Sequence, residues 1–326
     1  MYRRQILTAA PAALALTALR PAWAQSTSLS ETVNDLDQLQ SLQVQRGPEV
    51  IFAEAPRGGG LDRLTNIKSC SKSLVALCLG DAITSGAVPS ITATLGEVAP
   101  RLIPDSADAR VRDITLENLV SLRAGLASTS GPNYGAWVNS SNWNTYALTR
   151  EMEAEPGSRM IYSSGSTHLL GAALAEATGE TLLSQMRRIL GQPLGIEIPP
   201  WTRDPQGYYM GGNEMALTPR AMLKIAVMLR DGGRFEGRDV LPQSWIDAST
   251  TARTRSPWSG MSYGYGWFLN DSGYILARGY GGQIIAAHPE RDLAVAISSD
   301  PNRPARSEGY FGALMELLDG PILALA

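Results

Sequence analysis

The chain has 326 residues, of which 44% are hydrophobic and 18% charged, and its net charge is −3 at neutral pH. This length suffices for one large domain, and this composition is that of a folded globular protein, which excludes a disordered chain. Because the balance is acidic and no basic run occurs, nucleic acid is not expected as a partner.

The N-terminal residues have the pattern of an export signal. An arginine pair at 3–4 precedes an apolar stretch over 6–19, and an Ala-Trp-Ala cleavage signature follows at 22–24. The apolar stretch is shorter than the ~20 residues that span a bilayer, although an anchored helix is the alternative. We predict a signal peptide over 1–24, of either the twin-arginine or the general secretory type. The mature protein, 25–326, would be periplasmic or secreted and would have no membrane span.

The next part of the chain begins with helix and hairpin patterns. Leucines spaced for one face predict an amphipathic helix from Ser30 to Leu42. A hairpin is expected over 44–53, turning at Gly47-Pro48, and is followed by a glycine loop at 58–60. A strongly apolar helix, which should be buried, begins at Ser69.

This apolar helix contains both cysteines of the chain, Cys70 and Cys78. Eight residues of helix rise ~12 Å, whereas a disulfide tolerates a Cα separation of only ~7 Å. We therefore predict two buried thiols. The two histidines, His168 and His288, are scattered, so no metal site is expected.

The middle of the chain, about 85–200, is predicted to form a mostly helical lobe. Thr115 can cap one helix, and Thr218-Pro219 and Pro242 are start signals for two later ones. Expected helices cover 144–152, 167–177, 181–190, 218–229, 242–249 and 307–318; expected strands cover 263–269, 274–277, 283–287 and 293–298. Strands at both ends with helices between them predict an α+β fold, in which the lobe is inserted into a single domain over 25–326.

The first candidate catalytic element is Ser69-Cys70-Ser71-Lys72. Positions i and i+3 lie on one face of a helix, so the Lys72 amine can reach the Ser69 hydroxyl. A serine is a weak nucleophile unless a neighbour accepts its proton, and a buried amine with a lowered pKa can do so. Lysine is rare here, at positions 68, 72 and 224 only, and unlike arginine it can lose its proton. An ordinary helix start is the alternative interpretation.

Two further elements complete the pattern. Tyr162-Ser163-Ser164 stands at a loop-to-helix junction, where a phenol could shuttle protons, although a core tyrosine would look the same. Arg278-Gly279-Tyr280-Gly281-Gly282-Gln283 lies between two strand patterns. Its glycines could let a substrate approach the backbone, and one of its N–H groups could form an oxyanion hole with that of Ser69. A plain glycine-rich strand end is the alternative.

The order S-x-x-K, Y-x-S and glycine-rich strand resembles the class C β-lactamase and D,D-peptidase family of serine hydrolases. Longer segments that resemble the family lie at 114–126, 155–179, 217–233 and 277–296. The resemblance implies a five-stranded antiparallel sheet flanked by helices, a helical lobe, and an active site between them. It also implies Ser69 as nucleophile, Lys72 as its base, and Tyr162 as the group that protonates the leaving group and activates water.

The sequence departs from the family at two positions of the expected substrate site. Ser164 stands where asparagine is usual, and Tyr280 stands where the family has lysine or histidine. The missing cation argues against efficient hydrolysis of penicillins, unless Arg278 supplies the charge from the same face. Gly281, Gly282 and Gln283 are the other expected substrate-binding residues.

Other residues have more than one interpretation. The aromatic residues of the lobe could line the cleft or only pack the lobe; they are Tyr134, Trp137, Trp143 and Tyr146. Tyr208, Tyr209 and Asn213 could form a second wall of the cleft. His168 is expected to be buried and hydrogen-bonded.

The preferred hypothesis is a cofactor-free serine hydrolase that cleaves a small amide or ester. Alternatives are a β-lactamase or D,D-carboxypeptidase, and a ligand-binding homologue that acylates slowly or not at all.

Overall fold

The computed structural model describes residues 22–326, with side chains from Leu29 onward. Almost all of the predicted signal peptide lies outside these residues and stays a prediction. Within residues 22–326, no helix has both the length and the apolar character needed to cross a membrane.

The centre of the described chain is an eight-stranded antiparallel sheet in the order β2-β1-β12-β11-β10-β9-β8-β7. Its five longer strands are β1 (Leu39–Arg46), β2 (Glu49–Glu54), β10 (Ile275–Arg278), β11 (Ile284–His288) and β12 (Leu293–Ser299). Three strands of two residues each extend one edge: β7 (Thr254–Arg255), β8 (Ser262–Tyr263) and β9 (Phe268–Leu269). The predicted five-stranded sheet is therefore present with three short strands added.

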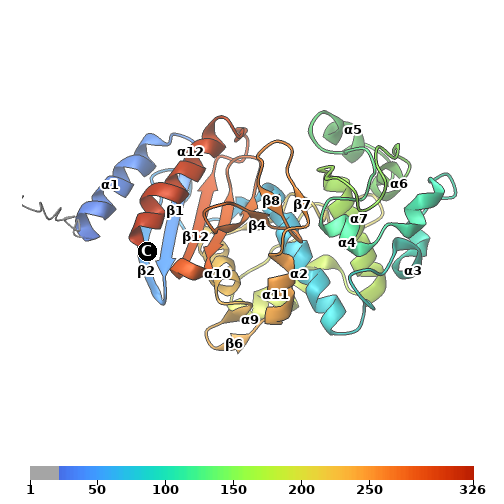
Figure 1. Ribbon diagram of the computed structural model, residues 1–326, viewed down its shortest axis with the longest axis horizontal. Coiled ribbons are helices and arrows are strands. Elements are labelled where there is room, and N and C mark those ends of the chain that lie inside the picture. The colour runs from blue at the N-terminus through green and yellow to red at the C-terminus, as the bar shows by residue number, and fades with distance from the viewer. Residues whose placement is uncertain (1–21) are drawn as a thin grey trace, which may run out of the picture.

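The two faces of this sheet carry different side chains. On β12, Val295 and Ile297 belong to one buried cluster, whereas Ala294 and Ala296 belong to another. This alternation follows from the two-residue period of a strand. The bulkier face is covered by α1 (Ala22–Asp35) and α12 (Tyr310–Leu317) (Figure 1). The alanine face allows close approach of α2 (Ser71–Thr84) and α10 (Pro219–Arg230).

Helices make up the middle of the chain and form the group at the right of Figure 1. The labelled helices of this group are α3 (Leu95–Val98), α4 (Leu116–Val120), α5 (Tyr134–Val138), α6 (Trp143–Leu148) and α7 (Ser164–Thr178). The chain continues through α8 (Leu182–Met186) to α9 (Gln192–Leu194), which is labelled near α11. Threonine caps begin several of them, and Thr115 makes the capping box expected of a helix start. Named strands of the described chain flank this segment, β3 (Thr65–Asn66) before it and β4 (Ala216–Leu217) after it, and these two pair.

Several predicted elements are confirmed. The 44–53 hairpin is present as β1 and β2, and α10 begins after Thr218, whose side chain accepts from Ala221 N. α11 (Gln243–Ser249) follows Pro242 as expected, after the small hairpin of β5 (Arg234–Phe235) and β6 (Arg238–Asp239).

The predicted helix from Ser30 to Leu42 is wrong, because α1 ends at Asp35 and β1 begins at Leu39. The pairing of β1 with β12 shifts register between Leu39 and Ser41. A β-bulge of this kind adds a residue, so Leu39 and Leu42 enter the same buried cluster although they are three positions apart. The three-residue spacing of Leu39 and Leu42, which is typical of one face of a helix, therefore arises here in a bulged strand.

The single strand predicted from Tyr263 to Leu269 is also wrong. The chain reverses inside it, and Tyr263 of β8 pairs with Phe268 of β9. Gly266 makes this turn with φ of +81°, and a Cβ there would lie 2.7 Å from Ala76 Cβ. Only glycine fits both the left-handed backbone and the close approach to α2.

Candidate active site

Ser69 lies in a short 3₁₀ turn, Lys68–Cys70, immediately before α2. The expected helix start is therefore correct to within one turn. The side chain of Ser69 is half-buried, and among the described residues its backbone N–H has no hydrogen-bond partner. Lys68 just before it adopts φ of +49°, a left-handed conformation that few non-glycine residues take. Cys70 and Cys78 are buried free thiols, as predicted.

Lys72 is directed from the first turn of α2 into a polar pocket. Its Nζ lies 3.2 Å from Ser69 Oγ and 3.2 Å from Ser164 Oγ, and it donates to Gly212 O at 2.6 Å. Only 3% of the residue is exposed. Burial lowers the pKa of the Lys72 amine below its usual 10.5, and interactions with Tyr162 and Cys70 oppose this shift.

Tyr162 brings a phenol to the same place. The Lys72 Nζ lies over its ring, 4.9 Å from the centroid. On another side the Trp258 ring meets it edge to face at 6.2 Å. The Ser128 hydroxyl donates to Tyr162 O at 2.6 Å and so fixes the backbone that carries the phenol. Ser69, Lys72 and Tyr162, which the sequence places far apart, therefore meet around one amine.

Ser164 begins α7, and its hydroxyl contacts Lys72 as described. Its backbone N–H donates to Ser130 Oγ at 2.8 Å, and the Ser130 and Ser164 hydroxyls lie 3.1 Å apart. Thr129 adds a second cap by accepting from Gly165 N at 2.8 Å. These bonds satisfy N–H groups that a helix start leaves free. Sequence reasoning missed Ser130, although its hydroxyl-rich segment, residues 128–130, was a usable signal.

In the third motif Tyr280 is exposed, whereas the residues on either side of it are buried. Tyr280 lies just beyond the end of β10 and is 57% exposed. Its carbonyl accepts from Ala305 N at 2.7 Å, while its own N–H has no hydrogen-bond partner among the described residues. The segment packs against the Ser69 turn, because a Cβ on Gly279 would lie 2.8 Å from Ile67 O.

Gly281, Gly282 and Gln283 do not face a substrate in the way the sequence suggested. A Cβ on Gly281 would lie 2.3 Å from Asp300 O, and one on Gly282 would lie 2.6 Å from the Tyr310 ring. Gln283 is fully buried; its amide accepts from Gly281 N and donates to Ser299 O, both at 3.0 Å. These residues are used inside the protein, where they shape the loop that carries Tyr280.

Arg278 is turned onto α12. Its guanidinium lies 3.4 Å from the centroid of the Phe311 ring, and it donates to Ala305 O at 3.1 Å. Burial lowers the pKa of Arg278 to about 10, and interaction with Tyr162 opposes the shift, so the group stays charged at neutral pH. Arg278 does not share an exposed face with Tyr280, but it is a second cation in the electrostatic environment of Tyr162.

An ion pair and a hydrogen bond beside Ser69 connect its turn to the loop that follows α9. Lys68 Nζ lies 3.3 Å from Glu214 Oε1, and Asn66 Nδ2 donates to Glu214 Oε2 at 2.8 Å. Glu214 adopts φ of +69°, so both ends of the ion pair lie on left-handed backbone. The sequence analysis missed Glu214 and the carbonyl of Gly212.

His168 is buried and hydrogen-bonded, as predicted. Its Nε2 lies 3.0 Å from Asp204 Oδ2, and both side chains are fully buried. Its Nδ1 accepts from Gly211 N at 3.4 Å, next to the carbonyl that holds Lys72. The pair therefore fixes the 204–212 loop from inside the lobe.

The aromatic residues of the lobe mostly pack one another. Trp137 and Trp143 form a buried cluster with Met210, and their rings flank His168 at 5.7 and 5.4 Å. Tyr134 is different, because its hydroxyl accepts from Asn213 Nδ2 at 3.0 Å next to Glu214. Asn213 is thus at the site.

Tyr208 and Tyr209 do not form the expected second wall beside Lys72. Tyr208 donates to Glu176 Oε1 at 2.6 Å, and Tyr209 is buried against Trp201. Both line a separate pocket on the lobe.

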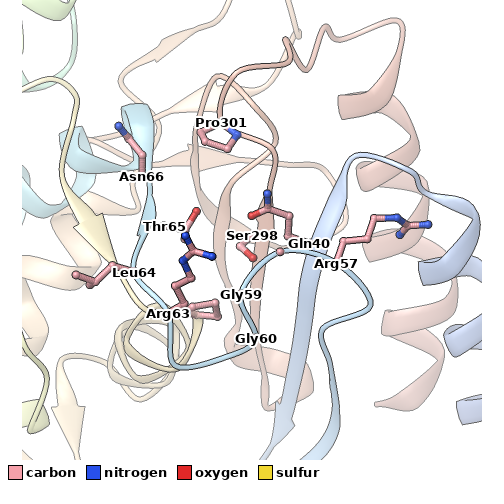
Figure 2. A pocket seen from close by; sticks show the side chains of 12 residues that line it. Gln40, Arg57, Gly59, Gly60, Arg63, Leu64, Thr65, Asn66, Ser298 and Pro301 are labelled. Carbon is pink, nitrogen blue, oxygen red and sulfur yellow. The ribbon is translucent and has the colours of Figure 1, made fainter.

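A pocket with a volume of about 270 Å³ opens elsewhere, and Figure 2 shows the side chains around it. Arg57, Arg63 and the glycines at 58–60 line it together with Thr65 and Asn66. Arg57 already donates to carbonyls of α1 and of the following turn, including Leu36 O at 3.2 Å. None of Ser69, Lys72 and Tyr162 lines this pocket, so the candidate active site is defined by the chemistry of its residues and not by this pocket.

Comparison with known proteins agrees with the family that the sequence motifs resemble. The family model described as Beta-lactamase matches residues 42–315. A Bacillus anthracis protein described as a 6-aminohexanoate-dimer hydrolase superposes with a TM-score of 0.75 at 17% identity, over 89% of this chain and 80% of its own. EstCE1, described as a hydrolase with promiscuous acyltransferase activity, gives 0.76 at 18% identity, over 92% of this chain and 98% of its own.

A penicillin-binding protein homologue from Caulobacter crescentus gives a TM-score of 0.74 at 18% identity, over 91% of this chain and 97% of its own. At these identities the likeness establishes the fold. The predicted β-lactamase/transpeptidase-like fold class is therefore confirmed.

Proposed function

Because this chain belongs to the beta-lactamase family of serine hydrolases, we propose that it cleaves a small ester or amide through an acyl-serine intermediate. One observation carries the proposal. The buried amine of Lys72 lies 3.2 Å from Ser69 Oγ and over the ring of Tyr162. A buried amine without a counter-ion is costly to keep charged, so the neutral base is the form that this environment favours.

Acylation begins at Ser69. Its Oγ attacks the carbonyl carbon of the substrate, and its proton passes to Lys72 Nζ. The bonds from Nζ to Gly212 O and Ser164 Oγ hold the amine in place and leave its lone pair for Ser69. The negative charge that develops on the carbonyl oxygen is accepted by the N–H groups of Ser69 and Tyr280, both of which lack internal partners among the described residues.

Tyr162 handles the leaving group. Its hydroxyl gives a proton to the departing alcohol or amine as the C–O or C–N bond breaks, and the phenolate then takes from Lys72 the proton that came from Ser69. Once Lys72 holds the proton of Ser69, it is the cation that faces the ring of Tyr162, with Nζ 4.9 Å from the ring centroid. In the second half of the reaction the Tyr162 hydroxyl returns a proton to Lys72, and the phenolate takes a proton from water as the water oxygen attacks the acyl carbonyl carbon. The bond from that carbon to Ser69 Oγ then breaks, and Ser69 takes the proton from Lys72.

The test is hydrolysis of p-nitrophenyl acetate by the purified mature protein, compared with Ser69→Ala. We expect turnover in the native protein and none above background in the variant. Equal rates in the two proteins would overturn the assignment of Ser69. A stable acyl adduct without turnover would instead identify a ligand-binding homologue.

A further inference from the structure

Two of the four most exposed large apolar side chains in the described chain belong to segments around the candidate active site. They are Trp258, 65% exposed, and Tyr280, 57% exposed; the other two are Val50 and Leu64. Exposed apolar residues scattered singly are ordinary, whereas an exposed indole in contact with a residue of the candidate site is a candidate binding surface.

Trp258 is held at the tip of a short closed loop between β7 and β8. Ser256 N donates to Met261 O at 2.9 Å, Gly260 N donates to Ser256 O at 3.0 Å, and Pro257 restricts the backbone before the indole. These bonds hold the backbone that carries the indole, and the Tyr162 ring contacts the indole, while most of its surface meets water. A side chain on an ordered backbone loses less entropy when it binds a ligand.

The indole also contacts the phenol that handles the leaving group. The Trp258 and Tyr162 rings meet at 6.2 Å with an interplanar angle of 88°. An alcohol or amine that takes a proton from Tyr162 is released beside a ring that Trp258 contacts. Trp258 therefore faces the departing half of the substrate rather than the acyl half.

Charges near the site do not favour an acidic leaving group. Lys68 is paired with Glu214, and the Arg278 guanidinium lies on Phe311 and donates to Ala305 O. Glu214 keeps 28% of its side chain exposed, so an added carboxylate nearby would meet like charge. Lys68 and Arg278 are thus committed to internal partners.

We propose that Trp258 is a specificity-determining residue that binds the leaving alcohol or amine. The substrate is then an ester or amide whose leaving group is uncharged and carries an aromatic or other flat apolar group. Such a group would cover the indole and remove apolar surface of both partners from water. This inference rests on the proposed function, because it takes Tyr162 as the acid for the leaving group.

The experiment uses three acetate esters that give the same acyl-enzyme: propyl acetate, 3-phenylpropyl acetate and 4-acetoxybutanoate. Their alcohols differ in apolar surface and charge but little in acidity, so kcat/KM reports recognition of the leaving group. We expect the native enzyme to prefer the phenylpropyl ester over the propyl ester by about tenfold, the effect of burying roughly 60 Å² of apolar surface. The carboxylate ester should be the poorest of the three.

Trp258→Ala should bring the phenylpropyl-to-propyl ratio close to one, and Trp258→Phe should restore most of it. Val50→Ala, which removes an exposed apolar side chain from the distant strand β2, should leave the ratio unchanged. Deacylation of the shared acetyl-enzyme should proceed at the same rate in Trp258→Ala as in the native protein, which separates leaving-group binding from a general disturbance of Tyr162.

An unchanged ratio in Trp258→Ala would overturn the inference while leaving the proposed function intact, provided that turnover still requires Ser69. A preference for 4-acetoxybutanoate would also overturn it, and would indicate that an exposed arginine such as Arg255 at the end of β7 reaches the leaving group. Turnover that survives in Ser69→Ala would instead remove the proposed function itself.

Discussion

The amine of Lys72 lies over the ring of Tyr162, 4.9 Å from its centroid. In that position the amine is also 3.2 Å from Ser69 Oγ. One buried nitrogen thus touches the proposed nucleophile and the proposed acid, so a proton can pass between them without entering water. Substitutions at the site and the pH dependence of the rate test this relationship.

Lys72→Arg should reduce kcat/KM for p-nitrophenyl acetate by roughly a hundred- to ten-thousandfold, the usual range for loss of a general base. Guanidinium keeps the positive charge but cannot accept a proton at ordinary pH. Lys224→Arg is the matched control, because Lys224 lies on α10 and its amine donates to Leu194 O at the end of α9, at 2.9 Å. Near-native activity in Lys72→Arg would remove the general-base role.

The pH dependence follows from the lowered pKa of Lys72. Below that pKa the amine is protonated and cannot accept the proton of Ser69; above it the amine is neutral and competent. We therefore expect kcat/KM to rise with pH and to level off at a midpoint below 10.5, the usual pKa of lysine. A rate that falls as pH increases from 5 to 9, measured with a chemically stable ester, would contradict this account.

Ser164→Ala should lower kcat/KM by about tenfold, the effect of one hydrogen bond of about 1.4 kcal/mol. The variant loses the contact from Ser164 Oγ to Lys72 Nζ at 3.2 Å and leaves Ser130 without that partner. Ser166→Ala, an equally buried serine on the same helix, is the control. Equal losses in the two variants would show that the effect is one of packing alone.

His168→Leu should lower the free energy of unfolding by roughly 3–5 kcal/mol, because it leaves the Asp204 carboxylate buried beside an apolar group. Urea denaturation measures this loss. Asp204→Asn should cost less, since its amide can still bond to the ring and to Asn144. A loss below about 1 kcal/mol in His168→Leu would mean that the pair does not hold the 204–212 loop.

Local signals were sufficient for much of the fold and for two residues of the candidate site, Ser69 and Lys72. Thr218-Pro219 and Thr115 start helices because a cap is a property of a few neighbouring residues. Ser69 and Lys72 could be paired from their spacing on one helix turn. Tyr162 needed the family pattern, because no local rule brings residue 162 next to residue 72.

What could not be predicted depends on contacts that are distant in the sequence. The carbonyl of Gly212 and the carboxylate of Glu214 approach the Ser69 turn only after the lobe folds back. Gln283 was expected at the substrate site because it belongs to the glycine-rich third motif, yet its amide donates to Ser299 O on the neighbouring strand β12. Leu39 was misplaced because a bulge, which depends on pairing with β12, changed its face.

The most direct measurement of the central claim is the mass of the intact protein, quenched in acid within milliseconds of mixing with a p-nitrophenyl ester. We expect a transient increase equal to one acyl group, located by peptide mapping on Ser69, in native protein but not in Ser69→Ala. Turnover of the ester without acylation of Ser69, or with acylation at another residue, would contradict the account.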